Sequence, residues 1–145
     1  MIAANFFNKE EKAALKEAIA QAELNTSGEI RLHVENHCKG DVLDCAAAWF
    51  DKLKMQKTEK RNGVLFYIAV KDRQFAIIGD AGINAVTPDD FWENIKEEML
   101  QHFKENRFAD GLVKGITMAG EQLKKQFPYQ SDDINELSNE ISFGK

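Results

Sequence analysis

The sequence lacks several features that mark common classes of protein. Its longest strictly apolar run, residues 64–70, has the length of a strand and is far short of the ~20 residues that a membrane helix needs. Basic residues are not in excess, because 19 Lys and Arg stand against 24 Asp and Glu, which gives a formal net charge of −5. No basic run is long enough to follow a phosphate backbone, so we expect neither a membrane span nor nucleic acid as a partner.

Motifs that would identify an enzyme are also missing. The sequence contains no phosphate-binding loop, and it lacks the Cys-x5-Arg loop of cysteine phosphatases, since the sixth residues after Cys38 and Cys45 are Asp44 and Asp51. An Asp-x-Asp-x-Thr nucleophile strand is absent as well. The first seven residues have no basic region of the kind that begins a secretory signal, so we expect a cytoplasmic protein, unless a leader has been removed.

Cysteine is scarce, because Cys38 and Cys45 are the only two. His33 and His37 lie close to them in the sequence, but the spacing matches none of the usual paired-ligand patterns of zinc sites. We expect ordinary reduced thiols, one of them partly buried, rather than a mixed Cys/His metal site.

The length of 145 residues suits one domain with a core of its own. We expect this domain to cover residues 1–127. Residues 128–145 form an acidic tail, in which Ile134, Leu137 and Ile141 recur at helical spacing. The tail therefore either docks on the domain as a short helix or stays mobile.

The first third of the chain predicts a helix, a strand and a second helix. Asn8 and Glu11 have the spacing of a capping box, which predicts a helix that ends near residues 24–25. Polar and apolar residues alternate over 29–35, which predicts a strand with one polar face at or near a sheet edge. Apolar residues then recur at helical spacing over 41–55.

The most informative stretch is residues 61–83, in which two β-rich apolar runs flank a charged turn at 71–73. This pattern predicts a buried hairpin. The preceding strand and helix complete a strand–helix–strand unit, whose two strands should run parallel. We therefore expect an α/β fold: a compact sandwich with a small mixed β-sheet, in which a parallel strand pair and an antiparallel hairpin strand are flanked by about four helices.

Two helical patterns follow the hairpin. The pattern over residues 87–105 begins with a threonine and a proline, which is the chemistry of a helix start. The pattern over 110–127 begins with Asp110, which we expect to cap the last helix. Gly111 and Gly115 inside this helix cost about 1 kcal/mol each relative to alanine, so we expect them to permit close packing.

Three turns should meet at one edge of the sheet, because the two parallel strands begin there and the returning hairpin strand ends there. These turns are residues 26–29, 61–63 and 79–84, and each contains glycine and polar side chains. The candidate ligand-binding residues are Glu29, Arg61, Asn62, Asp80 and Asn84. The carboxylates of Asp80 and Glu29, with backbone carbonyls, suit a hard cation such as Ca²⁺, whereas a helix starting near Thr87 would attract an anion.

These residues also have structural interpretations. Glycines at strand ends relieve backbone strain, and Arg61 can simply pair with an acid. Asp89 and Asp90 are near enough to join the site, but aspartates before a helix usually cap it. Asp80 is the strongest candidate, because it lies between two glycines where no cap is yet needed.

Five motifs occur in a characteristic order along the chain. They are Ser27-Gly28-Glu29, Arg61-Asn62-Gly63-Val64-Leu65, Asp72-Arg73, Gly79-x-x-Gly82-Ile83 and Phe103-x-x-x-Arg107-Phe108-x-x-Gly111-Leu112. This order resembles the TPM domain family over about residues 7–127; the family is named for a thylakoid lumen protein, a photosystem II repair protein and a nematode acetylcholine-receptor auxiliary subunit. The resemblance implies a compact α/β sandwich whose ligand-bearing edge is the loop around Asp80, with Asn62 and Glu29.

The resemblance also implies a choice of functions, since some family members are reported as weak acid phosphatases, some bind calcium and others are accessory proteins of membrane complexes. A phosphatase needs a nucleophile or a metal-bound water, and the missing motifs leave only metal assistance. We therefore expect an accessory module that binds an unidentified protein partner, with Ca²⁺ or another divalent cation at Asp80 and Glu29. The alternative is a weak metal-dependent acid phosphatase that acts on phosphomonoesters at the same site.

Overall fold

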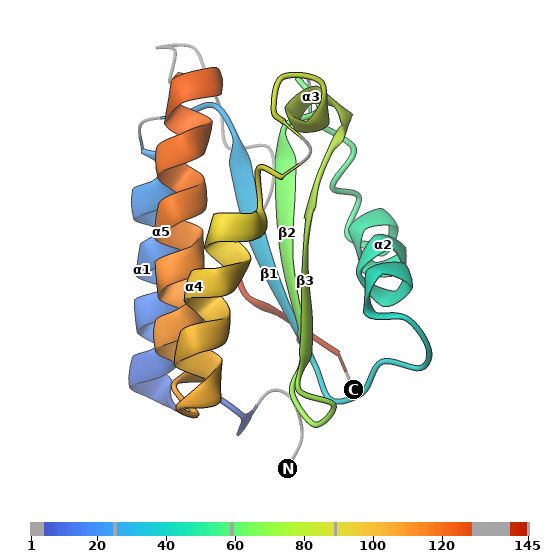
Figure 1. Ribbon diagram of the computed structural model, residues 1–145, viewed down its shortest axis with the longest axis vertical. Helices are drawn as coiled ribbons and strands as arrows, with labels where there is room; N and C mark the ends of the chain where they lie inside the picture. The colour runs from blue at the N-terminus through green and yellow to red at the C-terminus, as the bar shows by residue number, and fades with distance from the viewer. Residues whose placement is uncertain (1–4, 25, 59, 89, 129–139, 145) are drawn as a thin grey trace.

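A four-stranded mixed sheet separates two unequal layers of helices (Figure 1). The structure is a computed structural model that describes residues 5–24, 26–58, 60–88, 90–128 and 140–144. The strands are β1 (Glu29–Glu35), β2 (Gly63–Ala69), β3 (Gln74–Gly79) and β4 (Ser142–Phe143), in the order β3-β2-β1-β4. β1 is parallel to β2 and β4, and β2 is antiparallel to β3, so the predicted mixed sheet is confirmed.

Three helices cover one face of the sheet and one helix covers the other (Figure 1). The three are α1 (Lys9–Glu23), α4 (Glu93–Lys104) and α5 (Phe108–Gln126), and the single helix is α2 (Val42–Lys52). A one-turn helix, α3 (Ala81–Asn84), follows β3. None of the helices in the described part of the chain is long and apolar enough to cross a membrane.

The layers enclose two cores of different size. The larger core lies between the sheet and α1, α4 and α5, and it receives the apolar face of β1 that the alternation predicts: Ile30, Leu32 and Val34. The smaller core lies beneath α2 and contains Ala46, Tyr67, Ala69 and Ala76. All seven residues of β2 are buried, which accounts for the continuous apolar run that defined the hairpin in the sequence.

The predicted start of α1 is confirmed, and the predicted start of α4 is wrong. Asn8 Oδ1 accepts a hydrogen bond from the Glu11 amide at 2.7 Å, and Glu11 Oε1 accepts one from the Asn8 amide at 2.9 Å. Thr87 caps no helix, because its hydroxyl donates to the carbonyl of Ile83 at 2.9 Å and so completes the end of α3. α4 begins only at Glu93, without a side-chain cap.

Of the aspartates near these helix starts, Asp110 has a different place from the one predicted. Asp90 is exposed ahead of α4, and Asp89 lies outside the described residues. α5 begins at Phe108, so Asp110 lies in its first turn rather than at its cap. The Asp110 carboxylate accepts from Arg107 Nε at 3.0 Å, which is an exposed local ion pair.

The glycines of α5 permit close packing, as the sequence predicts. A Cβ added at Gly111 would lie 2.6 Å from the ring of Phe103, and one at Gly115 would lie 2.5 Å from the sulfur of Met99. Gly120 is packed in the same way, since a Cβ there would lie 2.6 Å from the Cβ of Ala22 on α1. These glycines therefore set the distance between α5 and its neighbours.

Ser142 and Phe143, near the end of the chain, pair with the sheet as a strand, whereas the sequence predicted either a docked helix or a mobile tail over residues 128–145. Ser142 and Phe143 form β4 beside His33 and Val34 of β1, and the side chain of Ile141 packs against the larger core. Of the other residues in that helical pattern, Ile134 and Leu137 lie outside the described part of the chain.

Candidate functional site

The three turns converge at one edge of the sheet, as predicted. We call this edge the loop rim and define it as residues 26–29, 58, 60–63 and 79–84. Glu29 is paired in register with Gly63, and the Asp80 amide donates to the Gly63 carbonyl at 3.0 Å. The Gly82 amide donates to the carbonyl of Arg61 at 2.8 Å, so backbone hydrogen bonds hold the rim together.

Asp80 is buried and fully engaged with its own chain. Its carboxylate accepts from Arg61 Nε at 2.7 Å and from Arg61 Nη2 at 2.8 Å, which is a bidentate ion pair. The same carboxylate accepts from the Ala81 amide at 2.7 Å and so caps α3. The expectation that no cap is needed here is therefore wrong, because a one-turn helix too short to show periodicity begins at the next residue. The hydrogen bond that Arg61 donates to Asp80, together with the negative charge of Asp80, raises the pKa of the Arg61 guanidinium.

Gly82 has a structural role at the rim. A Cβ at this position would overlap the carbonyl oxygen of Lys60 and would lie 2.7 Å from that of Arg61. Arg61 itself has a φ of 51°, in the left-handed region that favours glycine. The backbones of the second and third turns thus approach too closely for a side chain between them.

Asn62 carries the one buried side-chain oxygen of the rim that lacks a hydrogen-bond partner among the described residues. The residue is 1% exposed, and its amide donates to Thr58 Oγ1 at 3.1 Å. Its Nδ2 donates to Ser27 Oγ at 3.4 Å, while its Oδ1 is buried and accepts no hydrogen bond. A buried, unsatisfied amide oxygen is unusual and is the kind of group that a bound cation would satisfy.

Glu29 lies at the same rim, but β2 separates it from Asp80 by two strand spacings, roughly 10 Å. Its charge acts instead on Glu23, at the end of α1. Glu23 Oε2 accepts from the Ile30 amide at 2.7 Å. Burial raises the pKa of Glu23 to about 8 against the lowering effect of that hydrogen bond, and the charge of Glu29 adds to the rise.

Asn84, the fifth predicted residue, has a local role. Its Nδ2 donates to the Gly79 carbonyl at 3.1 Å and closes the turn around α3. The structure therefore brings Arg61 and Asp80 into direct contact and places Asn62 beside them through the backbone. It does not gather the predicted carboxylates, and the described residues hold no group of three or more His, Cys, Asp or Glu that could bind a metal.

The rim offers a hard cation only a partial set of ligands. Ca²⁺ takes six to eight oxygen ligands, and Asn62 Oδ1 is available for that purpose. The Asp80 carboxylate becomes available only if Arg61 leaves it. The anion site expected near Thr87 has no basis, because the helix begins at Glu93.

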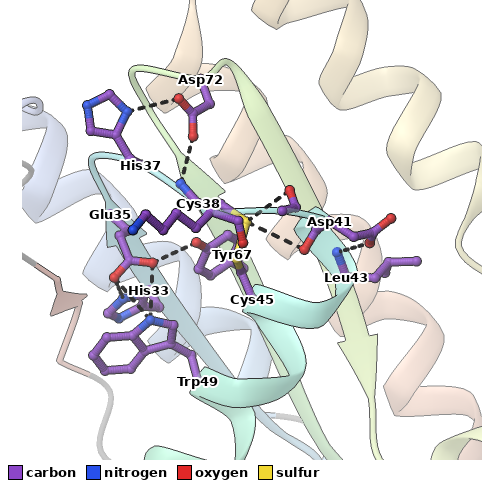
Figure 2. The surroundings of a disulfide bond; sticks show 12 residues. His33, Glu35, His37, Cys38, Asp41, Leu43, Cys45, Trp49, Tyr67 and Asp72 are labelled. Carbon is purple, nitrogen blue, oxygen red and sulfur yellow. Dashed lines mark hydrogen bonds and ion pairs between the residues drawn. A yellow bond between two sulfur atoms is a disulfide. The ribbon is translucent and has the colours of Figure 1, made fainter.

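A second polar cluster, which the sequence did not reveal, lies beneath α2 (Figure 2). We call it the Glu35 cluster and define it as His33, Glu35, Trp49 and Tyr67. The Glu35 carboxylate accepts from the Tyr67 hydroxyl at 2.6 Å and from Trp49 Nε1 at 3.0 Å. The ring of Trp49 stacks on that of His33 with 3.8 Å between centroids. The alternation in β1 placed His33 and Glu35 on one polar face, but it gave no sign that Trp49 would cover them.

His33 is the most buried titratable group of this cluster. Its side chain is inaccessible, its Nδ1 lies 2.9 Å from Ser142 Oγ, and its Nε2 lies 3.7 Å from Glu35 Oε1. Burial lowers the pKa of His33 to about 4, although the neighbouring Glu35 opposes the shift. Burial and the hydrogen bond to Glu35 raise the pKa of Tyr67. His33 is therefore neutral near pH 7.

Cys38 and Cys45 form a disulfide beside this cluster (Figure 2), so the expectation of reduced thiols is wrong. Gly40, with a φ of 90°, turns the chain back on itself and leaves 6.1 Å between the two Cα atoms, which is within disulfide reach. The loop is also tied to the hairpin turn, because Asp72 accepts from the Cys38 amide at 2.6 Å and bonds to His37 Nδ1 at 2.9 Å. The hydrogen bond with His37 lowers the pKa of Asp72.

Comparison with known proteins places the chain in a family. A TPM domain family model matches residues 1–122. The NMR structure of the BA42 protein from the psychrophilic bacterium Bizionia argentinensis is 50% identical, with 96% of each chain covered and a TM-score of 0.91. Two other NMR structures share the fold at low identity. The N-terminal domain of a P. gingivalis protein is 16% identical, with 86% of this chain and 80% of that chain covered and a TM-score of 0.69. The N-terminal domain of a Corynebacterium glutamicum protein is 12% identical, with 91% and 82% covered and a TM-score of 0.67.

A search of curated proteins finds no match for the chain. The family model covers most of the sequence, including all three turns of the loop rim. The chain therefore belongs to the TPM domain family.

Proposed function

We propose that this chain is a non-catalytic accessory module that binds a protein partner. The observation that supports this proposal is the engagement of Asp80, the strongest ligand-binding candidate in the sequence and the residue on which a metal-assisted phosphatase would depend. Both of its carboxylate oxygens face Arg61, and one of them also accepts from the Ala81 amide. A nucleophile or general base needs a carboxylate that is free to meet the substrate, whereas that of Asp80 already accepts three hydrogen bonds from its own chain.

A phosphatase assay tests the non-catalytic part of this proposal. We expect p-nitrophenyl phosphate to be hydrolysed no faster than in buffer, with or without Ca²⁺ or Mg²⁺. The matched variants are Asp80→Asn at the rim and Asp44→Asn, which is exposed on α2. Turnover that disappears in Asp80→Asn but persists in Asp44→Asn would overturn the proposal in favour of a metal-dependent phosphatase.

We propose in addition that a divalent cation binds weakly at the loop rim, in competition with Arg61. The unsatisfied Asn62 Oδ1 supports a cation there, and the guanidinium of Arg61 occupies the Asp80 oxygens that the cation would need. Removal of Arg61 should therefore make Ca²⁺ binding several-fold tighter, because one positive charge no longer competes with another.

Calorimetric titration of Ca²⁺ into three variants checks this competition. We expect Arg61→Gln to bind more tightly than the wild type, Asp80→Asn to bind more weakly, and the control Arg107→Gln to bind as the wild type does. Arg107 is a suitable control because it is exposed and pairs with Asp110, away from the rim. Equal affinity in all of them would show that the cation does not use Asp80.

A further inference from the structure

The strand β3 ends the sheet on one side, and part of its backbone has no strand to pair with. The Asp80 amide donates to the Gly63 carbonyl, which fixes the alternation of the β2–β3 ladder. In an antiparallel pair every second residue directs its N–H and C=O away from its neighbour. The residues directed outward are therefore Phe75, Ile77 and Gly79, and the last of these carbonyls accepts from Asn84.

The residues of this strand supply none of the features by which a sequence protects a sheet edge. Natural edges are blunted by lysine, proline, bulges or inward-pointing charges. β3 reads Gln-Phe-Ala-Ile-Ile-Gly, without a charge or a proline, and its pairing with β2 has no bulge. Such an edge is a template for another extended segment.

α2 and α4 flank β3 in Figure 1, and a groove between these two helices reaches β3 at Phe75 and Ala76. A hollow of about 380 Å³ is lined by Leu43 of α2, by Phe75 and Ala76 of β3, and by Glu97 and Leu100 of α4, among others. Leu43 is 53% exposed and Leu100 is 44% exposed, so each wall of the groove presents a large apolar side chain to solvent.

A second hollow of about 190 Å³ continues the groove toward the hairpin turn. The two hollows share Phe75 and Leu100, so they adjoin each other beside residues 74–76, the first half of β3. Adjoining apolar hollows beside a free strand edge suit an extended segment with alternating apolar side chains.

The two ends of this groove carry opposite charge. Glu93 and Glu97 line the first hollow with Lys96, which lies 3.8 Å from Glu93, and no ion pair among the described residues involves Glu97. Arg73 and Lys104 line the second hollow, and neither takes part in an ion pair of the described residues. The acidic end thus lies at the start of α4 and the basic end at its close.

We propose that an extended segment of a partner protein binds in this groove as a fifth strand, antiparallel to β3, with a basic residue near its start and an acidic residue near its end. An antiparallel segment begins beside the end of β3, so its charges match the two ends of the groove. Glu97 and Lys104 are seven helical residues apart, roughly 10 Å, which equals about three residues of strand. This inference rests on the binding role proposed above and names the class of partner.

A second copy of this chain is a poorer occupant than a single segment. α2 and α4 both contribute to the same hollow, so β3 is recessed between them. In a second copy β3 is recessed in the same way, and two recessed edges cannot meet. A segment without helices on its two faces has no such obstacle.

Selection from a library of random heptapeptides displayed on phage tests the proposal. We expect the wild-type protein to enrich peptides with apolar residues at alternating positions, Lys or Arg toward the N-terminus and Asp or Glu toward the C-terminus. Leu43→Lys and Leu100→Lys should each lose this enrichment, whereas Leu24→Lys should retain it, since Leu24 is 60% exposed outside the groove. Absence of enrichment, or enrichment that survives both groove variants, overturns the proposal.

Amide hydrogen exchange with a synthetic copy of the selected peptide identifies the binding mode. We expect the amides of Phe75 and Ile77 to exchange at least tenfold more slowly in the complex, while those of Ala76 and Ile78, already paired with β2, change little. Peptide binding without protection of Phe75 and Ile77 would overturn strand addition. A concentration-dependent dimer that Leu100→Lys abolishes would assign the groove to a second copy instead.

These outcomes separate the inference from the proposed function. A partner whose binding is unchanged by the groove variants would overturn the strand-addition site and leave the accessory role intact. Phosphatase turnover dependent on Asp80 would overturn the non-catalytic role without affecting peptide binding in the groove.

Discussion

His33 and Glu23 are buried titratable residues whose pKa values are shifted by the same cause in opposite directions. Burial disfavours the charged form of each, so the pKa of the histidine falls to about 4 and that of the glutamic acid rises to about 8. Both groups are therefore neutral in the folded protein near pH 7. In the unfolded protein the pKa of the histidine is near its ordinary value of 6.5, and the pKa of the glutamic acid is near 4.5.

Protonation of His33 should make the protein less stable in acid. Below pH 6.5 the unfolded chain takes up a proton that the folded chain refuses until about pH 4, so the unfolding free energy falls over this window. The loss attributable to His33 should approach about 3 kcal/mol at pH 4. Urea unfolding between pH 4 and pH 7 checks this, with His33→Phe expected to remove that part of the acid loss.

The control for this experiment is His37→Gln, because His37 is exposed and its side chain bonds to Asp72. We expect His37→Gln to keep the steep decline between pH 6.5 and 4. If His33→Phe and the wild type lost stability in parallel, burial of the neutral imidazole would not be the cause.

Glu23 should make the protein less stable in alkali. Its folded-state pKa is raised, so its contribution is fully present below pH 4.5 and is lost as the pH rises through about 8. Glu23→Gln keeps an oxygen for the Ile30 amide and cannot ionise. At pH 8.5 we expect this variant to be more stable than the wild type by about 4–5 kcal/mol, and at pH 4.5 we expect the two to be nearly equal. A difference of the same size at both values would contradict the assignment.

At the scale of the element, α2 is held by the disulfide at its first turn. Cys45 lies on α2, Cys38 lies in the loop before it, and their closed loop spans a sequence separation of 7. In the chain-entropy account a loop of this size contributes about 2–3 kcal/mol by restricting the unfolded chain. We expect Cys38→Ser with Cys45→Ser to lower the unfolding free energy by about that amount in urea, and a reducing agent to have no effect on this double variant.

The same disulfide should also affect the groove beside β3. Leu43 lies between the two cysteines, so the wall that α2 contributes is part of the closed loop. We expect reduction of the disulfide in the wild-type protein to lower its affinity for the selected peptide several-fold, as measured by NMR titration. Unchanged affinity after complete reduction, confirmed by thiol labelling, would show that the first turn of α2 holds its place without the bond.

Gly120 fixes the distance between α1 and α5. Helix propensity alone predicts that Gly120→Ala stabilises the protein by about 1 kcal/mol. The added Cβ would lie 2.6 Å from the Cβ and 2.9 Å from the Cα of Ala22, so we expect a loss of about 1–3 kcal/mol instead. The sign of the change in unfolding free energy, measured by urea unfolding, decides between these two expectations. Addition of Ala22→Gly should recover part of the loss, and Lys114→Ala, exposed on the same helix, should change little.

The elements that the sequence predicts correctly are those with several signals in agreement. The capping box at Asn8 and the continuous apolar run of β2 each match the observed element. The prediction that α4 starts at Thr87 was wrong because a threonine followed by a proline is equally suited to the end of a helix. The helix that ends there, α3, is too short for its periodicity to be recognised in the sequence. Local chemistry thus identifies a boundary without showing which helix it belongs to.

At the scale of the whole molecule, the convergence of the three turns was predictable and their chemistry was not. Parallel and antiparallel pairing determines which strand ends share an edge, and this information is present in the order of the elements. The partner of Asp80 depends on Arg61, whose left-handed backbone directs its side chain back to that carboxylate. Similarly, the disulfide depends on a turn at Gly40. Both contacts depend on single backbone angles that residue patterns do not encode.

The pairing of β4 joins the end of the chain to the Glu35 cluster. Ser142 Oγ lies 2.9 Å from Nδ1 of His33, the Gly144 amide donates to the Val34 carbonyl at 2.8 Å, and Phe143 packs against the larger core. β4 therefore covers the buried imidazole on the side where β1 would otherwise be the edge of the sheet. Removal of this cover should hydrate His33 and weaken the fold.

A chain that ends at Pro128 tests this role of β4. We expect the free energy of unfolding of this shortened chain to be about 1–3 kcal/mol lower than that of the full chain, because the packing of an aromatic side chain and a strand pairing are lost. The pKa of His33, followed by NMR, should rise from about 4 toward 6.5, since burial is the main cause of its present value. Ser142→Ala in the full chain keeps the cover and loses only the hydrogen bond, so its His33 should stay close to the wild-type value. If the pKa in the shortened chain also remained near 4, the cover would come from Trp49 and α2 alone, and β4 would contribute stability without protecting the histidine.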